Sequence, residues 1–149
     1  MNGQGKARKS YTIWRRVLLG LCIFVGIGAL AGGGLAVIVP DGSLMSAQEL
    51  IPVVQKAPLV GPYIDSLLIP GLALLLLVCL PQAVAAILLL RRHPAQYRAG
   101  IICGVFMAAV TIGELVILGT NFLSWLYLSF AVVEIVAGMW LSKMSRVSK

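Results

Sequence analysis

The sequence predicts an all-α membrane protein, a four-helix transmembrane bundle that forms one domain over residues 1–149. Three observations predict this fold. The chain is 60% hydrophobic and only 11% charged, whereas soluble domains carry about 25% charged residues. Its apolar residues form four runs that are long enough to cross a bilayer, and its basic residues gather at one set of ends of these runs.

The four apolar runs have the length of transmembrane helices. A helix needs about 20 residues, at about 1.5 Å each, to cross a hydrocarbon core of about 30 Å. Helices are expected because backbone groups in lipid must hydrogen-bond internally, and the runs lack the alternation of a membrane barrel. The predicted spans are about 17–39, 67–90, 99–119 and 123–141, and the short hairpin at 91–94 makes the second and third helices antiparallel neighbours.

The basic residues predict the orientation. Five of them precede the first span, three lie between the second and third, and three follow the fourth. Of the 12 Lys and Arg residues, only Lys56 stands in a connection on the other side. The positive-inside rule therefore predicts that both termini are cytoplasmic.

The first apolar run allows a second interpretation. Val17–Gly28 follows a basic segment and precedes Ala29-Leu30-Ala31, a pattern that resembles a signal peptide with a cleavage site. The apolar run continues to Val39, however, and exceeds the roughly 7–15 residues of a signal peptide core. A retained helix is favoured, and an intact mass distinguishes the two interpretations.

Residues 40–66 form the predicted outer segment between the first two helices. Residues 46–49, Ser-Ala-Gln-Glu, match a capping box, so a short helix is expected to start at Ser46. The next residues are too apolar for a freely solvated loop. We therefore expect this segment to lie at the lipid interface or to cap the bundle. The apolar residues are Leu50, Ile51, Val53 and Val54.

Small residues mark candidate packing positions. Gly28 and Gly32 form a Gly-x-x-x-Gly pair in the first span, and Gly33 lies beside them. Gly138 lies in the fourth span. Such residues let helices approach closely in lipid. Packing within the bundle is the favoured interpretation, and a contact with a second copy or another membrane protein is the alternative.

Glu134 lies near the middle of the fourth span, where a carboxyl group costs a few kcal/mol to insert. Its helical face carries Tyr127 and Gly138, so we expect it to point into the bundle. Gln82 lies at a similar depth in the second span and is the predicted hydrogen-bond partner. Because Pro81 frees a backbone carbonyl, Gln82 could bridge Glu134 and this perturbed backbone.

Glu114 lies nearer the outer end of the third span, and Thr111 shares its face as the expected hydrogen-bond partner. These polar residues allow two interpretations. One is a ligand-binding or proton-linked site centred on Glu134. The other is an interhelical hydrogen bond with a protonated carboxyl group, because lipid-like surroundings disfavour charge. The candidate site residues are Glu134, Glu114, Gln82, Tyr127 and Thr111.

Other kinds of site have no support in the sequence. Cys22, Cys79 and Cys103 each lie inside an apolar run and are expected to be small buried hydrophobes. His93 is the single histidine and has no Cys or carboxylate near it in sequence. No catalytic, metal or cofactor motif appears. The basic residues are expected to contact anionic lipid head groups rather than nucleic acid.

The second half of the chain carries a resemblance. The motifs run in order from Ile69-Pro70-Gly71, through residues 88–94 (Leu-Leu-Leu-Arg-Arg-His-Pro), to residues 114–119 (Glu-Leu-Val-Ile-Leu-Gly). Residues 124–127 (Ser-Trp-Leu-Tyr) and then Glu134 follow. This order resembles a group of uncharacterised small bacterial integral membrane proteins with four transmembrane helices. The resemblance implies a fold and a bacterial inner membrane, and it implies no activity.

Two better-known classes fit less well. Small multidrug-resistance transporters carry an essential Glu in their first helix, and the first span here has no acidic residue. Thiol oxidoreductases of the vitamin K epoxide reductase type need paired cysteines, which this chain lacks. The sequence therefore favours a non-enzymatic accessory or interaction subunit, or a binder of a lipid-like ligand. The alternative is a small proton-coupled transporter that uses Glu134.

Reporter fusions test the predicted topology. Fusions after Arg92 and after Lys149 are expected to report the cytoplasm, and a fusion at Gln55 is expected to report the outside. The reason is the bias of the basic residues toward one side of the membrane. A cytoplasmic signal at Gln55 would contradict the four-span arrangement.

Overall fold

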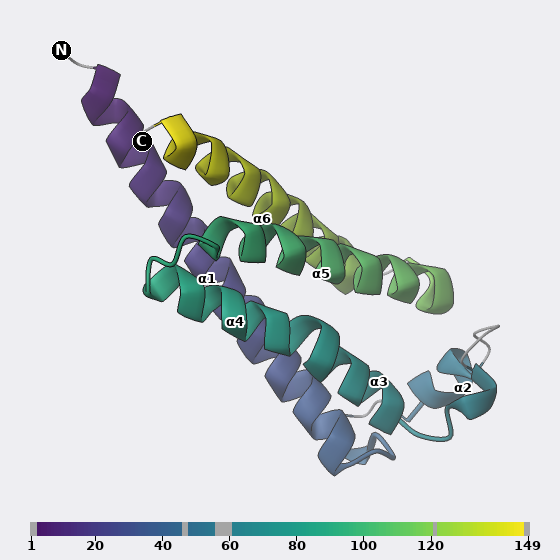
Figure 1. Ribbon diagram of the computed structural model, residues 1–149. Helices are drawn as coiled ribbons and strands as arrows, with labels where there is room; N and C mark the ends of the chain where they lie inside the picture. Colours follow the sequence, from purple (N-terminus) through teal and green to yellow (C-terminus); the bar gives the residue numbers. More distant parts are fainter. Residues whose placement is uncertain (1–2, 46–47, 56–60, 121, 148–149) are drawn as a thin grey trace.

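The computed structural model describes residues 3–45, 48–55, 61–120 and 122–147, and over these ranges the chain consists of helices and turns (Figure 1). The predicted all-α fold is confirmed for this part of the chain. In order, the elements are α1 (Gly3–Ile38), η1 (Ser43–Met45), α2 (Leu50–Val54), η2 (Gly61–Tyr63), α3 (Leu68–Leu74), the π-helical turn η3 (Leu75–Cys79), α4 (Leu80–Leu90), α5 (Gln96–Leu118) and α6 (Phe122–Val147).

Four stretches of the described chain are long and apolar enough to cross a membrane, as predicted. Large apolar side chains point outward from them, such as Phe24 and Val116, which are 62% and 78% exposed. A soluble protein rarely exposes so much contiguous apolar surface. The chain is therefore a multi-pass membrane protein. The four stretches are Lys9–Ile38, Leu68–Leu90, Gln96–Ile117 and Phe122–Ser145.

The bundle consists of two helix pairs. α1 packs along α3, η3 and α4, while α5 packs along α6. Contacts of α4 with α5 and of α1 with α6 join the pairs. We call the end where α1 begins, α6 ends and the α4–α5 hairpin lies the terminal end, and the end with η1, α2 and η2 the loop end. Figure 1 shows the two pairs diverging toward the loop end.

The tightest packing lies toward the terminal end. Side chains from all four membrane stretches meet in one buried cluster there. Leu18, Leu89 and Leu141 are completely buried, and Cys103 is 2% exposed. This cluster fixes the positions of α1, α4, α5 and α6 relative to one another.

Glycines bring the backbones of α1 and α3 into contact. A Cβ atom on Gly33 would lie 2.9 Å from the carbonyl oxygen of Gly71. A Cβ atom on Gly71 would lie 2.8 Å from the Cβ of Ala36. Only glycine allows the two helices to approach this closely.

A second glycine contact holds α5 against α6. A Cβ atom on Gly104 would lie 2.9 Å from the carbonyl oxygen of Ala131, and one on Gly138 would lie 3.1 Å from the carbonyl oxygen of Tyr97. The two glycines of the Gly-x-x-x-Gly pair lie differently. Gly28 and Gly32 face no other backbone, and a Cβ atom there would meet side chains at 3.6 Å.

The second membrane stretch is interrupted by a wider turn. In η3 the backbone N–H of Leu80 donates to the carbonyl oxygen of Leu75, five residues earlier. Pro81 follows directly and has no N–H to contribute. The π turn takes up one extra residue where the proline disturbs the regular ladder. The sequence predicted a disturbance at Pro81 but not this turn.

The α4–α5 hairpin is closed by two backbone hydrogen bonds. The N–H of His93 donates to the carbonyl oxygen of Leu88 at 2.9 Å, and that of Arg92 donates to Leu89 at 3.3 Å. This is the Schellman pattern, and Arg92 takes the left-handed position with φ 52°. α4 and α5 are thus antiparallel neighbours, as predicted.

α2 covers part of the loop end, where the two helix pairs diverge. Ile51 of α2 packs against Ala36 and Leu67. The expectation that this apolar segment caps the bundle is therefore confirmed for Ile51. α2 begins at Leu50, and Ser46 of the predicted capping box lies outside the described residues.

Gly33→Ala is predicted to lower the free energy of unfolding by about 1–3 kcal/mol, the usual cost of overpacking. Gly34→Ala is the matched control, because a Cβ atom there meets nothing within 4 Å. Both changes gain about 1 kcal/mol of helix propensity. The difference between their unfolding free energies therefore reports the contact of Gly33 with α3. Thermal unfolding of both variants in one detergent measures it. Equal midpoints would contradict the close approach of α1 and α3.

Candidate functional site

Glu134 is completely buried in the middle of the bundle, and Gln82 of α4 is 1% exposed. Nε2 of Gln82 donates to both Oε1 and Oε2 of Glu134, at 3.0 Å each. The predicted contact between these two residues is confirmed. The carboxyl group is thus satisfied by a neighbouring helix and does not face lipid.

This pair belongs to a layer to which α1, α4, α5 and α6 each contribute one side chain. α1 provides Cys22 and α5 provides Cys103, which are 1% and 2% exposed. Both are free thiols that lie near Glu134 and belong to the buried cluster of the bundle. We call Cys22, Gln82, Cys103 and Glu134 the central layer. The four predicted spans contain no Lys or Arg, so no basic side chain of a span pairs with Glu134.

The amide oxygen of Gln82 is left without a partner in the described part of the chain. Oε1 is buried and accepts no hydrogen bond there. The sequence suggested that Gln82 also bonds to backbone near Pro81, and no such second contact forms among the residues that the structure describes. A buried unsatisfied acceptor costs about 1–3 kcal/mol. The hydrogen bonds from Nε2 to Glu134 therefore hold Gln82 in an orientation that leaves its Oε1 unpaired. This oxygen is a free acceptor in the central layer of the described chain.

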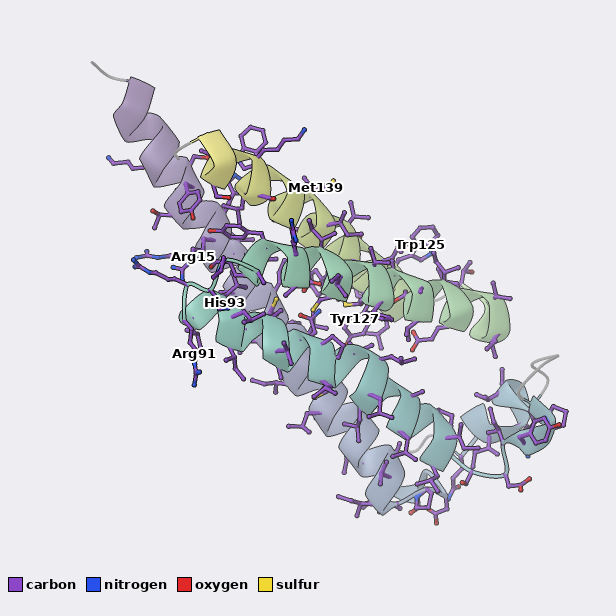
Figure 2. All side chains as sticks on the ribbon, in the orientation of Figure 1. Arg15, Arg91, His93, Trp125, Tyr127 and Met139 are labelled. Atoms are coloured by element: carbon purple, nitrogen blue, oxygen red, sulfur yellow. The ribbon has the colours of Figure 1, made fainter. Side chains whose placement is uncertain are left out.

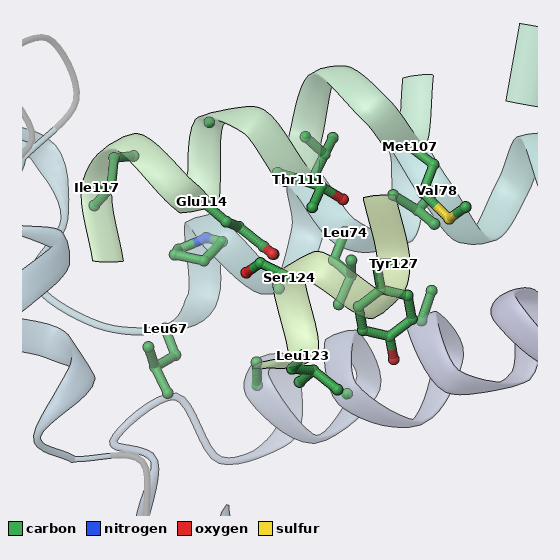
Figure 3. A pocket seen from close by; sticks show the side chains of 18 of the residues that line it. Leu67, Leu74, Val78, Met107, Thr111, Glu114, Ile117, Leu123, Ser124 and Tyr127 are labelled. Atoms are coloured by element: carbon green, nitrogen blue, oxygen red, sulfur yellow. The ribbon is translucent and has the colours of Figure 1, made fainter. Parts of the chain in front are cut away.

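A cavity of about 590 Å³ lies between the two helix pairs, on the loop side of the central layer (Figure 3). Its inner end is lined by Val25, Val78 and Met107. These residues lie three or four positions from Cys22, Gln82 and Cys103 along their helices, which is about one turn. The cavity therefore ends next to the central layer. Its volume falls within the range of about 300–1,000 Å³ typical of small-molecule sites.

The cavity wall is mostly apolar, with four polar side chains. Thr111 and Glu114 come from α5, while Ser124 and Tyr127 come from α6 (Figure 3). Glu114 forms a side-chain hydrogen bond with Ser124. The sequence predicted Thr111 as the partner of Glu114, and the described structure has Ser124 instead. Thr111 and Ser124 are each 2% exposed.

Sequence reasoning missed Ser124, although a signal for it exists. α5 ends at Leu118 and α6 begins at Phe122, so the connection is very short. A short connection places the last turn of one helix opposite the first turn of the next. Glu114 and Ser124 lie in those two turns, so they meet.

Tyr127 belongs to the cavity and not to the central layer. The sequence predicted that Tyr127 shares a helical face with Glu134, about two turns away. Its ring packs edge-to-face with Phe130, with centroids 6.3 Å apart. A Cβ atom on Gly28 would lie 3.6 Å from its hydroxyl. Figure 2 shows Tyr127 between the helices and Trp125 pointing away from the bundle. The five candidate residues thus form two sites: Gln82 with Glu134, and Thr111 and Glu114 with Tyr127.

Arg15 has a structural role at the terminal end. One guanidinium nitrogen donates to the carbonyl oxygen of Leu89 at the end of α4, and Nε donates to Oε1 of Gln96 at 3.4 Å. Figure 2 shows Arg15 at the same end as His93. The hydroxyls of Tyr11 and Tyr97 also hydrogen-bond there. Arg15 therefore ties α1 to the α4–α5 hairpin, although the sequence grouped it with the residues that contact lipid head groups.

No protein-family model, no curated protein and no solved structure matches this chain. The resemblance to small bacterial membrane proteins therefore remains a prediction. Within the described residues, no group of three or more His, Cys, Asp and Glu side chains is arranged to hold a metal ion.

Glu134→Leu is predicted to lower the free energy of unfolding by about 0.6–3 kcal/mol, because the buried amide of Gln82 then loses its hydrogen-bond acceptor. Glu134→Gln keeps the shape and can still hydrogen-bond, so a purely structural site tolerates it. Unfolding of both variants in the same bicelles measures the difference. A loss of cellular phenotype in Glu134→Gln at unchanged protein level would show that ionisation matters.

Proposed function

We propose that this protein is a non-enzymatic multi-pass membrane protein that binds a lipid-like ligand in the cavity between its two helix pairs. The cavity itself supports this proposal most directly. Val25, Leu74, Val78, Met107 and Leu123 line it with apolar surface suited to a hydrocarbon chain. Two of its rim residues, Ile69 and Leu123, are 47% and 56% exposed. A ligand dissolved in the bilayer could therefore enter between the pairs without first crossing water.

The proposal includes a place and an orientation. The terminal end faces the cytoplasm of a bacterial inner membrane, and the loop end with the cavity faces outward. The supporting observation is the position of the basic residues, eleven of which lie toward the terminal end of the sequence spans. The exposed basic side chains there contact anionic head groups, at about 1 kcal/mol each. They are Lys9, Arg16, Arg91, Arg92, Arg98 and Lys143.

A small proton-coupled transporter is the second candidate. One observation favours it: the inner end of the cavity lies about one turn from Glu134 and from the unpartnered amide oxygen of Gln82 in the described chain. A ligand that fills the cavity would then lie close enough to the Glu134 carboxyl group to alter its surroundings. Loss of transport in Glu134→Gln, with ligand binding retained, would favour this candidate over a binding protein.

Gly32→Leu tests the lipid-binding proposal. A Cβ atom on Gly32 meets only a Leu74 methyl group at 3.6 Å, so a larger side chain extends into the cavity. We expect this variant to bind co-purifying lipid or a labelled single-chain probe about tenfold more weakly, a loss of about 1.4 kcal/mol. Native mass spectrometry from nanodiscs measures the bound ligand.

Gly20→Leu is the matched control. Gly20 lies on the same helix and is exposed, and a Cβ atom added there would have no neighbour within 4 Å. The substitution adds the same side chain outside the cavity. If both variants retain as much ligand as the original chain, the cavity is not the binding site.

A further inference from the structure

The described residues give the wall of the cavity one acidic side chain and no basic one. Of the described residues that line it, Glu114 is the only Asp or Glu, and none is Lys, Arg or His. Its hydrogen-bond partner, Ser124, is neutral. A hydroxyl group has one hydrogen to donate, whereas a carboxylate offers about four lone-pair sites. Glu114 can therefore accept further hydrogen bonds from a ligand in the cavity.

Thr111 adds a second acceptor next to Glu114. The two residues are three positions apart on α5, so their side chains lie on one face about 5–6 Å apart at Cβ. Thr111 is 2% exposed and lines the cavity, and the oxygen of a hydroxyl group has two lone pairs with which to accept hydrogen bonds. A small head group with several donors could reach both Thr111 and Glu114.

The charge around the cavity favours a cation. Four of the five acidic residues, all except Glu134, lie in or near the loop end, and Lys56 is the only basic residue of that segment in the sequence. The backbone N–H of Ser43 donates to Asp41, and this hydrogen bond lowers the pKa of Asp41. Asp41 is therefore charged at neutral pH. A negative surface raises the local concentration of cations and repels anions.

We infer that the cavity binds a single-chain amphiphile with a primary ammonium head group, which donates to Glu114 and Thr111 while its alkyl chain extends toward Val78 and Met107. This inference rests on the proposed function, since it assigns the ligand class of the same cavity. An ammonium group supplies the opposite charge that favours an ionised carboxyl group in low-dielectric surroundings. It also forms charge-assisted hydrogen bonds, which are stronger than neutral ones.

The same geometry disfavours other head groups. A fatty-acid carboxylate would place a second negative charge beside Glu114 in a medium that screens charge poorly. An alcohol fits but lacks the charge. A trimethylammonium group has the charge and can contact the ring of Tyr127, yet it has no hydrogen to donate to Thr111. A primary ammonium is thus the head group that carries the charge opposite to Glu114 and can donate to both Glu114 and Thr111.

Binding of labelled dodecylamine to the full chain in phosphatidylcholine nanodiscs tests the inference, with empty nanodiscs subtracted. Dodecanol, dodecanoate and dodecyltrimethylammonium are measured in the same way. We expect dodecylamine to bind most tightly. Glu114→Gln should weaken its binding about tenfold or more and leave dodecanol unchanged. Thr111→Val should weaken dodecylamine severalfold. Asp65→Asn removes an exposed acid that does not line the cavity, so it should weaken dodecylamine binding far less than Glu114→Gln does.

Several results would overturn the inference. Dodecanoate or dodecyltrimethylammonium binding as tightly as dodecylamine would contradict the assigned head group, as would unchanged dodecylamine binding in Glu114→Gln. In these cases, the lipid-binding cavity would still be supported if some probe binds to the original chain and Gly32→Leu abolishes that binding. If no probe binds above the empty nanodiscs, the proposed function fails together with the inference.

Discussion

Close contact between glycine-bearing helix faces is the constraint on which this structure depends. In lipid, apolar side chains gain little by leaving their surroundings, so packing and hydrogen bonds must hold helices together. Gly33 meets Gly71 between α1 and α3, and Gly104 and Gly138 lie at the interface of α5 and α6. These contacts account for the pairing of α1 with the second membrane stretch and of α5 with α6. The hydrogen bond from Gln82 to Glu134 then joins one pair to the other.

The cavity follows from this arrangement. Beyond the central layer, toward the loop end, each pair keeps its own close contacts while the two pairs diverge (Figure 1). The space between them is lined by the faces that have no partner helix in the described chain, which include Gly28 and Gly32 of α1. Small residues that do not meet another backbone leave room for a ligand. Glycine thus has two roles on α1. On one face it allows close contact with α3, and on another it leaves space for the cavity.

Two sets of polar groups occupy different depths of the bundle. The amide nitrogen of Gln82 donates to Glu134 where all four membrane stretches are tightly packed, and this contact stabilises the bundle. Glu114 meets only a neutral hydroxyl in the described cavity wall, and Thr111 lines the wall beside it with a hydroxyl that can also accept hydrogen bonds. Placing a carboxyl group within the membrane is energetically costly, and such residues commonly mark a ligand or ion site. We therefore place the ligand at Glu114, although sequence reasoning put more weight on Glu134.

The four membrane stretches and the Glu134–Gln82 contact could be predicted from the sequence, because hydropathy, helical spacing and depth are local properties. Three features were not predicted. The π turn at η3 depends on how the chain accommodates Pro81 within a packed helix. The partner of Glu114 depends on the register of the α5–α6 hairpin. Which glycines of α1 meet a neighbour depends on its rotation about its own axis, and Gly32 and Gly33 lie about 100° apart on an α-helix.

A double-mutant cycle on Gln82 and Glu134 tests most directly whether this pair joins the two halves of the bundle. The free energies of unfolding of Gln82→Leu, Glu134→Leu and the double variant are measured in the same bicelles. The coupling energy is expected to be about 1 kcal/mol or more, because each single change leaves a buried polar group without its partner. Additive effects, with a coupling energy near zero, would contradict the account.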